Sequence, residues 1–425
     1  MEVGSLIFMK TEQKEKPMGF DNLGISPSIL AALQNLGITN PTPIQHKAIP
    51  IAIVGGDLIG IAQTGTGKTF AFGVPMIEQL GKTNGKGLVL LPTRELALQV
   101  EENLRLLGEK MGLRTAALIG GEAISKQVAQ IRRNPHIVVA TPGRLNDALK
   151  RGIIRLSQVK VLVLDEADMM LDMGFLPQVE EILSQVPKDR QTMLFSATMP
   201  TAIARLAATH MKLPVSIEVA PAGSTAEKVE QEMYVMRKDD KFMHLEKILK
   251  DHDGSVLIFA RTRFGAKHLT QQLGQIKISV AEIHSNRSFE QRKAALAGFK
   301  SGKYRVLVAT DIAARGIDVK GIELVINYDL PDASEDYVHR IGRTGRAGKP
   351  GKAISFAVPS QYKDIKSIER LIKKEIALTK FAELNVPISR NSKDNPRRRF
   401  GSYGVASKFR PSGGGGRQGN RRTSR

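Results

Sequence analysis

Two short motifs constrain the fold of this 425-residue chain more than any other feature. The first is AQTGTGKT, which ends in Lys68 and Thr69, and the second is DEAD at residues 165–168, directly behind the apolar run VLVL. In a phosphate loop of the first kind, backbone amides around its glycines cradle phosphate, the lysine supplies charge and the threonine binds magnesium. A buried strand that ends in acids would place Asp165 beside the metal and Glu166 beside an attacking water. A solvated acidic turn would need neither the buried run nor the upstream loop, so we expect an α/β fold with an ATP-hydrolysing site.

Short runs of Val, Ile and Leu alternate with amphipathic helical stretches in both halves of the chain, which is typical of parallel sheets covered by helices. We expect strands near residues 58–61, 87–91, 115–119, 137–141, 159–164 and 191–195, and then near 255–260, 279–283, 305–310, 323–328 and 353–358.

A weak internal similarity connects the two halves. LVLLPTR at 88–94 resembles VLIFARTR at 256–263, and VVATPGR at 138–144 resembles LVATDIAARG at 307–316, at offsets of 168 and 169. Two matches at nearly one offset favour a duplicated fold. The same offset carries Lys68 to Met236, where no glycine could form a phosphate cradle, so one half is expected to have lost the nucleotide loop.

The run APAGST at 220–225 interrupts the pattern with small and turn-forming residues and is the expected hinge. We therefore expect five parts: a flexible N-terminal extension, a first domain, a linker, a second domain and a disordered basic tail, at residues 1–18, 19–218, 219–227, 228–380 and 381–425.

Composition narrows the chemistry and the partners. The absence of cysteine excludes disulfides, thiolate metal sites and cysteine nucleophiles. No apolar run has the length of a membrane-spanning helix, so we expect a cytoplasmic protein without a membrane partner. The net charge of +21 points to a polyanion, and residues 389–425 hold eleven basic residues against the single acid Asp394. That glycine-rich tail is expected to tether RNA non-specifically, or else only to keep the chain soluble.

The segment HRIGRTGRAG at 339–348 alternates arginines with glycines. Glycine lets a backbone approach phosphate closely, and a guanidinium can neutralise charge on a transferred γ-phosphoryl group. We expect Arg343 and Arg346 to act as arginine fingers that reach the phosphates only when the two halves close. A solvated basic turn would give no reason for glycine at every third position.

Polar residues follow several strands of the first half: Pro92, Thr93 and Arg94, the pair Gly120–Gly121, and then Thr141, Gly143 and Arg144. Strand ends, hydroxyls and arginines of this kind grip a sugar-phosphate backbone, although each alone could equally be an ordinary helix cap. Aromatic residues make up 5% of the chain and tryptophan is absent, so backbone recognition fits better than a base-stacking platform.

Taken together, these motifs resemble the DEAD-box family of ATP-dependent RNA helicases, from about Phe20 to Val358. GITNPTPIQ at 37–45 resembles the family's Q motif. It is followed in family order by AQTGTGKT, PTRELA, GG, TPGR, DEAD, SAT at 196–198, VLIFARTR, ATDIAARGID at 309–318 and HRIGRTGR. The resemblance implies two tandem RecA-like domains that use ATP and Mg²⁺, and the short Arg- and Gly-rich tail suggests a bacterial-type member.

The resemblance also implies roles for individual residues. Glu166 would be the water-orienting base and Asp165 a magnesium ligand with Thr69, while Gln45 would recognise adenine and Phe20 would stack on it. Further nucleotide contacts would come from Thr64, Gly65, Thr66, Gly67, Lys68, Gly316 and Asp318. Ser196 and Thr198 would link hydrolysis to domain movement through Asp168 and His339. The RNA backbone would meet Arg94, Gly121, Thr141, Gly143, Arg144, Arg261 and Thr310.

The leading hypothesis is a monomeric RNA-dependent ATPase that unwinds short duplexes or remodels RNA–protein complexes, with ribosomal or RNA-decay proteins as possible partners. Two alternatives stay open at this point. The protein could act as an ATP-gated RNA clamp in a larger assembly, or as a translocating DNA helicase that shares the phosphate loop.

Overall fold

The computed structural model describes residues 19–63, 65–219, 229–314, 319, 321–345 and 351–380. Over these residues the chain forms two seven-stranded sheets, and each pairing between their strands is parallel. The predicted fold class of parallel sheets flanked by helices is confirmed. The domain boundaries stay predictions, since residues 1–18, 220–228 and 381–425 lie outside the described residues.

The first sheet has the strand order β3-β4-β2-β5-β6-β1-β7. Its strands are β1 (Leu58–Ile61), β2 (Lys86–Leu90), β3 (Thr115–Leu118), β4 (Ile137–Ala140), β5 (Val159–Leu164), β6 (Gln191–Ser196) and β7 (Val215–Glu218). Six of them lie within one residue of their predicted limits. The edge strand β7 was not predicted, because only one of its four residues is buried and an apolar run is therefore missing.

The second sheet has the order β10-β11-β9-β12-β13-β8-β14. Its strands are β8 (Val229–Val235), β9 (Val256–Phe259), β10 (Val280–Ile283), β11 (Val306–Ala309), β12 (Leu324–Asn327), β13 (Gly351–Ala357) and β14 (Ala377–Lys380). Five of them match their predicted positions to within two residues. The sequence did not predict β8 or β14, because VEQEMYV and ALTK mix polar and apolar residues without a clear strand pattern.

The helices of the first half are α1 (Pro27–Asn35), α2 (Pro43–Ile53), α3 (Lys68–Thr83), α4 (Arg94–Gly108), α5 (Ile124–Arg132), α6 (Pro142–Lys150), α7 (Ala167–Asp172), α8 (Leu176–Leu183) and α9 (Thr201–His210), with short 3₁₀ turns η1 (Phe20–Asn22) and η2 (Glu109–Met111). Those of the second half are α11 (Lys241–Asp251), α12 (Arg263–Gln275), α13 (Phe289–Lys300), α14 (Asp311–Ala314), α15 (Ser334–Ile341) and α16 (Tyr362–Ile372), with η3 (Lys238–Asp240) and η4 (Pro359–Gln361).

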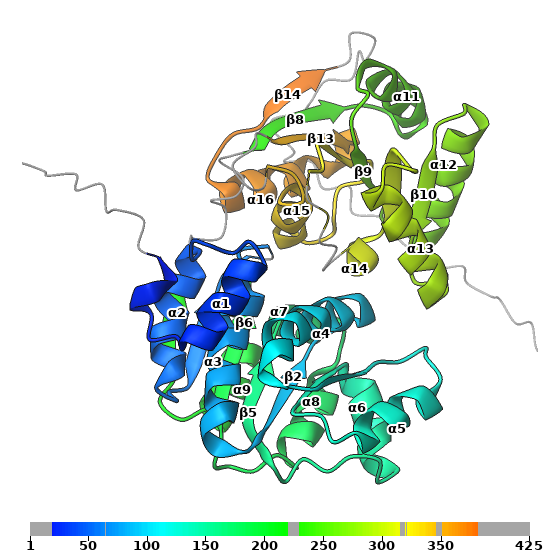
Figure 1. Ribbon diagram of the computed structural model, residues 1–425. Helices are drawn as coiled ribbons and strands as arrows, with labels where there is room; N and C mark the ends of the chain where they lie inside the picture. Colours follow the sequence, from blue (N-terminus) through cyan, green and yellow to red (C-terminus); the bar gives the residue numbers. More distant parts are fainter. Residues whose placement is uncertain are drawn as a thin grey trace, which may run out of the picture. The chain divides into compact units, whose positions relative to one another are not determined.

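Alternate residues along the strands pack on opposite faces of each sheet, which gives three layers per sheet. In the first sheet, Val89 and Leu91 share one core with α1 to α4, whereas Leu88 and Leu90 share another with α6 to α9. In the second sheet, α11 and α12 cover one face and α13 to α16 the other (Figure 1). The carboxyl ends of the strands in each sheet therefore meet at one edge, where the predicted polar residues lie.

The two sheets correspond strand by strand, since β3, β4, β2, β5, β6, β1 and β7 occupy the same places as β10, β11, β9, β12, β13, β8 and β14. This correspondence confirms the predicted duplication. It also corrects one equivalence, because Met236 is the counterpart of Ala62 rather than of Lys68. The Met236 amide donates to the last residue of β13, as the Ala62 amide donates to the last residue of β6. Lys241 begins the helix after β8 and is the true counterpart of Lys68.

Within the described residues, none of the helices combines the length and the apolar character that a membrane crossing requires.

Candidate nucleotide and RNA-binding site

The segment between β1 and α3 has the backbone of a phosphate loop. Gly65 and Gly67 adopt positive φ angles of 88° and 92°, which few side chains tolerate, and Gly67 is the N-cap of α3. The Thr66 hydroxyl donates to the carbonyl of Gln63 at 2.7 Å and closes the turn. The free amides at the start of α3 then face an incoming anion. Thr64, another predicted nucleotide contact, lies outside the described residues.

Gln45 connects the Q-motif segment to this loop. Its side-chain amide donates to the Gly67 carbonyl at 3.0 Å, and its carbonyl oxygen accepts from the Thr42 amide at 2.9 Å. A Cβ added at Gly67 would lie 2.5 Å from the Gln45 Nε2 atom, so the close approach requires glycine. The buried Gln45 thus supports the phosphate loop, while its predicted contact with adenine stays a prediction.

Phe20, the predicted stacking partner of adenine, lies in η1 with only 4% of its surface exposed. It belongs to the core that α1 to α4 share, and it borders a small hollow together with Leu30, Leu33 and Ile38. Stacking on a nucleotide base stays a prediction for this residue.

Lys68 and two carboxylates form a buried charged cluster at the carboxyl edge of the first sheet. The Lys68 ammonium lies 3.0 Å from Glu166 Oε1 and 3.9 Å from Asp165 Oδ1, and all three residues are at most 6% exposed. Burial alone would lower the pKa of Lys68, but the charges of Glu166 and Asp165 outweigh it and raise that pKa. Burial is the main reason why the pKa of Asp165 rises to about 7, with Lys68 acting in the opposite direction. Such a cluster can accept a phosphate group and its cation together.

The turn after β5 directs the two acids. Glu166 adopts a left-handed backbone with φ of 54°, and its amide donates to Asp165 Oδ1 at 2.9 Å. A left-handed conformation is costly for a residue with a side chain and is concentrated at functional sites. Both carboxylates lie within 3.9 Å of the Lys68 ammonium, so the turn presents them to the same cation.

The residues present fit a magnesium ion bound together with nucleotide phosphates. Thr69 and Asp165 would supply a hydroxyl and a carboxylate, the hard oxygen donors that Mg²⁺ prefers, and phosphate oxygens and water would complete its shell. Among the described residues, no cluster of three or more His, Cys, Asp or Glu side chains could hold a metal by itself. Magnesium usually binds through one or two protein oxygens plus substrate phosphates, and Thr69 and Asp165 would be the two protein oxygens.

Asp168 joins the DEAD segment to the SAT segment after β6. Its Oδ2 atom accepts from the Ala197 amide at 3.1 Å and from the amide and hydroxyl of Thr198 at 2.9 and 3.0 Å. The Asp168 amide in turn donates to the Ser196 hydroxyl at 3.1 Å. Burial opposes ionisation of Asp168, but Lys68 and the two hydroxyls outweigh it and lower its pKa. The structure therefore brings together three of the predicted coupling residues.

The predicted RNA contacts of the first sheet gather at the ends of β2, β3 and β4. The Arg94 guanidinium passes so close to Gly121 that an added Cβ there would overlap it. Arg144 donates to Gln127 Oε1 at 3.1 Å and to the Glu122 carbonyl at 3.2 Å. Gln127 is almost fully buried and orients Arg144. Nothing in the polar sequence of its helix predicted this role. Of the remaining predicted contacts, Pro92 and Thr93 precede α4, and Thr141 and Gly143 lie at the start of α6.

Of the two threonines Thr93 and Thr141, one caps a helix as the alternative interpretation predicted. The Thr93 hydroxyl accepts from the Leu96 amide at 3.3 Å and caps α4, whereas the Thr141 hydroxyl makes no capping bond to α6. A capping role does not exclude a contact with RNA, so both RNA contacts stay predictions.

The second sheet places four further predicted residues at its carboxyl edge. Arg261 follows β9, Thr310 follows β11, and His339 and Arg343 lie in and just after α15. Arg343 is 4% exposed and donates to the His339 carbonyl at 3.3 Å. Gly316, Asp318 and Arg346 lie outside the described residues.

Comparison with known proteins agrees with this geometry. Residues 42–206 match the family model described as DEAD/DEAH box helicase, and residues 240–348 match the model described as helicase conserved C-terminal domain.

Curated relatives include the ATP-dependent RNA helicase DbpA of Bacillus subtilis, which is 44% identical over 84% of this chain and 75% of that protein. The DEAD-box ATP-dependent RNA helicase CshA of Geobacillus kaustophilus is 42% identical over 84% of this chain and 77% of that protein. Among solved structures, S. cerevisiae Dbp5 bound to RNA and ADP BeF3 has a TM-score of 0.78 at 30% identity, covering 85% of this chain and 95% of that one. Mss116p bound to ssRNA and AMP-PNP has a TM-score of 0.79 at 28% identity, covering 87% and 81%.

Proposed function

The chain belongs to the DEAD-box family of ATP-dependent RNA helicases, and from that membership we propose how its own residues share the work of an RNA-dependent ATPase. It couples ATP hydrolysis to the unwinding or remodelling of RNA, which decides against the reading as a DNA helicase. The observation that carries the proposal is the buried cluster of Lys68, Asp165 and Glu166 beside a glycine loop.

Hydrolysis begins with an exchange of partners by Lys68. In the structure its ammonium is paired with Glu166 at 3.0 Å. The phosphates of ATP give Lys68 a new anionic partner, so Glu166 is released to accept a proton from the attacking water. The left-handed backbone at Glu166 belongs to the turn that carries this carboxylate.

Magnesium supplies charge neutralisation of the transferred phosphoryl group, and Thr69 and Asp165 are its proposed protein ligands. Gln45 and Phe20 form the proposed adenine subsite, and Thr64 to Thr69 hold the phosphates. From the second domain, Gly316 and Asp318 complete the nucleotide contacts.

RNA binding uses the carboxyl edges of both sheets. We assign the backbone contacts to Pro92, Thr93, Arg94, Gly121, Thr141, Gly143, Arg144, Arg261 and Thr310. Apart from Pro92, which has no amide hydrogen, these residues offer backbone amides, hydroxyls and guanidinium groups that suit phosphate and sugar rather than base edges. Little sequence preference is expected as a result.

Closure of the two domains on RNA and ATP completes the catalytic site in this proposal. Arg343 and Arg346 then act as fingers on the γ-phosphate, where such arginines stabilise developing charge. We assign the coupling of nucleotide hydrolysis to domain movement to Asp168, Ser196, Thr198 and His339. The supporting observation is the hydrogen-bonded network that Asp168 forms with both SAT residues.

The setting of the protein is a further part of the proposal. We place it in the cytoplasm as a monomer that works beside ribosomal or RNA-decay proteins. The support is its similarity to bacterial RNA helicases and its net charge of +21.

The substitution Glu166→Gln tests the proposal because it keeps the size of the side chain and removes the base. We expect turnover at saturating RNA to fall by about 10²- to 10⁴-fold, the usual contribution of a general base, while ATP and RNA still bind. RNA-stimulated ATPase assays and equilibrium binding measure the two properties.

Glu180→Gln on the exposed face of α8 is the matched control and should behave as the wild type. Normal turnover of Glu166→Gln would remove Glu166 from its assigned role. A wild-type protein that hydrolyses ATP without any response to RNA would overturn the coupling itself.

A further inference from the structure

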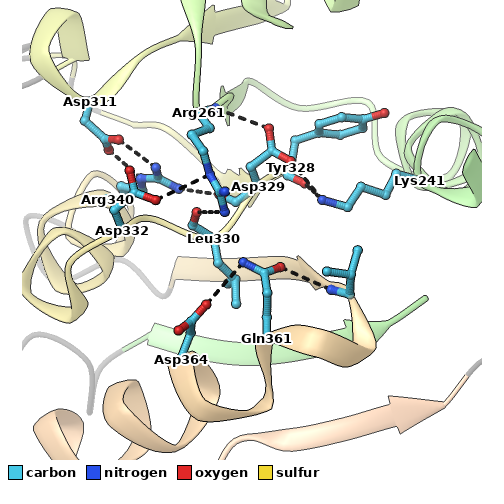
Figure 2. A network of polar contacts seen from close by, with 11 residues as sticks. Lys241, Arg261, Asp311, Tyr328, Asp329, Leu330, Asp332, Arg340, Gln361 and Asp364 are labelled. Carbon is cyan, nitrogen blue, oxygen red and sulfur yellow. Dashed lines mark hydrogen bonds and ion pairs between the residues drawn. The ribbon is translucent and has the colours of Figure 1, made fainter. Parts of the chain in front are cut away.

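Three cationic side chains converge on the turn that follows β12 in the second sheet, residues 328–330 (Figure 2). Lys241 reaches it from α11, Arg261 from the end of β9, and Arg340 from α15. The turn occupies the position that the DEAD acids occupy in the first sheet, because β12 corresponds to β5. The phosphate loop belongs to the first sheet, so these contacts in the second sheet require another explanation.

Lys241 is the central cation of this group. Its ammonium donates to the Tyr328 carbonyl at 2.7 Å and to Asp329 Oδ1 at 2.9 Å, and only 3% of the residue is exposed. Lysine is rarely fully buried unless it is paired. A buried lysine with two hydrogen-bond acceptors therefore indicates a structural or positioning role. At that depth its ammonium cannot touch RNA directly.

Asp329 connects Lys241 to Arg261. Its second oxygen, Oδ2, accepts from the Arg261 backbone amide at 3.2 Å, and the Arg261 guanidinium donates to the Leu330 carbonyl at 3.1 Å. Burial opposes ionisation of Asp329, but Lys241 and the Arg261 amide outweigh it and lower its pKa. Both the backbone and the side chain of Arg261 are thus tied to one turn that Lys241 holds in place.

Arg340 holds the other side of the same turn and has support of its own. It donates to the Asp329 carbonyl at 2.6 Å, and it forms a two-pronged ion pair with Asp311. It also donates to Asn327 and lies 5.0 Å from the centre of the Phe259 ring. Loss of Lys241 or of the Asp329 charge should therefore loosen Arg261 first and leave α15 and the following Arg343 largely in place.

We propose that Lys241 and Asp329 are positioning residues that hold Arg261 in the geometry needed to contact the RNA backbone. The proposal rests on the function given above for Arg261. The pair acts through Arg261 and not on ATP, so it should change the RNA concentration needed for activity more than the maximal rate.

Asp329→Asn is the sharpest test, because it keeps size and the acceptor facing Lys241 but loses the acceptor facing the Arg261 amide. We expect the RNA concentration for half-maximal ATPase to rise about fivefold, as suits a lost hydrogen bond that acts on RNA only through Arg261. Maximal turnover should stay within about threefold of wild type, because the nucleotide loop is on the other sheet and α15 keeps its own anchor through Arg340 and Asp311. Lys241→Met should raise the half-saturating RNA concentration about tenfold or more, since it leaves buried acceptors unpaired.

A double-mutant cycle with Arg261→Gln separates positioning from general support of the fold. If Asp329 acts through the Arg261 side chain, Asp329→Asn should change half-saturation less than about twofold in the Arg261→Gln background. An equal effect in both backgrounds would overturn the proposal. Lys250→Met is the control on the same helix, where the side chain is 70% exposed and pairs with Glu246, and it should match the wild type.

The outcomes separate this inference from the function on which it rests. A wild type without RNA-stimulated ATPase contradicts the function, whereas a stimulated wild type whose half-saturation Asp329→Asn leaves unchanged contradicts only the inference. Thermal unfolding is measured for every variant, and if Lys241→Met fails to fold, the Asp329→Asn cycle decides alone.

Discussion

In the first sheet, the segment between β1 and α3 contains Gly65 and Gly67 with positive φ, whereas the segment between β8 and α11 in the second sheet is MRKDD and forms the turn η3. The helix that follows begins with lysine in both cases, Lys68 and Lys241. Each lysine pairs with an acid after the corresponding strand, at 3.0 Å to Glu166 and at 2.9 Å to Asp329. The two sheets therefore keep the same pair of charges in the same place and differ in the loop beside it.

The difference teaches what makes one of these places a nucleotide site. Lys68 faces two carboxylates, whereas Lys241 binds one carboxylate and the main-chain carbonyl of Tyr328. Lys241 could not replace the Tyr328 carbonyl by a phosphate as its hydrogen-bond acceptor without disturbing the turn. Lys241 therefore has a structural role. In the function proposed above, the glycine loop and the second acid are what convert a buried ion pair into a catalytic site.

The same substitution at both lysines gives the largest expected contrast. Lys68→Met should lower turnover by about 10²- to 10³-fold at saturating RNA, the usual loss for one group that stabilises transition-state charge. Lys241→Met should keep turnover within about threefold once RNA is saturating, because it affects Arg261 and not the phosphates. Steady-state ATPase assays compare them, and a similar collapse of both maximal rates would mean that the second lysine also serves catalysis.

Gly67→Ala should give the next largest effect. The added Cβ would meet Gln45 Nε2 at 2.5 Å, and the backbone φ of 92° is strained for alanine. We expect ATP affinity to fall about tenfold or more, since 1 to 2 kcal/mol of strain enters the loop that holds the phosphates. Lys238→Ala, an exposed site in the corresponding segment of the second sheet, is the control. Binding of a fluorescent ATP analogue measures the affinity of both variants. Wild-type affinity in Gly67→Ala as well as in Lys238→Ala would contradict the expected role of the glycine loop.

The loop of the first sheet and most strands could be predicted from sequence, because apolar runs and a glycine pattern are local signals. The counterpart of Lys68 could not. The matched strands gave an offset of 168 or 169, but β8 and the loop after it shift the register, so the offset led to Met236 and missed Lys241. The partners of Lys241 lie 87 and 88 residues away in sequence, a distance that no local pattern spans.

The network around Asp168 offers a smaller contrast with the turn after β12. In the first sheet the Asp168 carboxylate accepts hydrogen bonds from Thr198 in the loop after β6. In the second sheet the Arg340 guanidinium instead donates to the Asp329 carbonyl in the turn after β12. Thr198→Val removes the hydroxyl bond of 3.0 Å to Asp168 and keeps the shape. We expect turnover within about threefold but about fivefold less strand separation per ATP, because coupling energies of 1 kcal/mol or more depend on such contacts. A duplex-unwinding assay with parallel ATPase measurement checks this, and unchanged unwinding per ATP would exclude the coupling role.

The smallest contrast concerns two helix caps in equivalent places. Thr93 accepts from the Leu96 amide at 3.3 Å, and Thr262 accepts from the Gly265 amide at 3.0 Å. Replacing either by valine should cost about 1 kcal/mol and lower the melting temperature of its domain by roughly 2 to 4 °C. Only Thr93 was predicted to contact RNA, so Thr93→Val should also raise half-saturating RNA by about threefold, as suits a lost neutral hydrogen bond.

Thermal unfolding and RNA titration of both variants would separate the two roles. If Thr262→Val raises half-saturating RNA as much as Thr93→Val does, the cap sets RNA affinity by holding the strand end, and the Thr93 hydroxyl has no contact of its own. If only Thr93→Val weakens RNA binding at an equal loss of stability, the first sheet has added an RNA contact to a cap that both copies of the fold share.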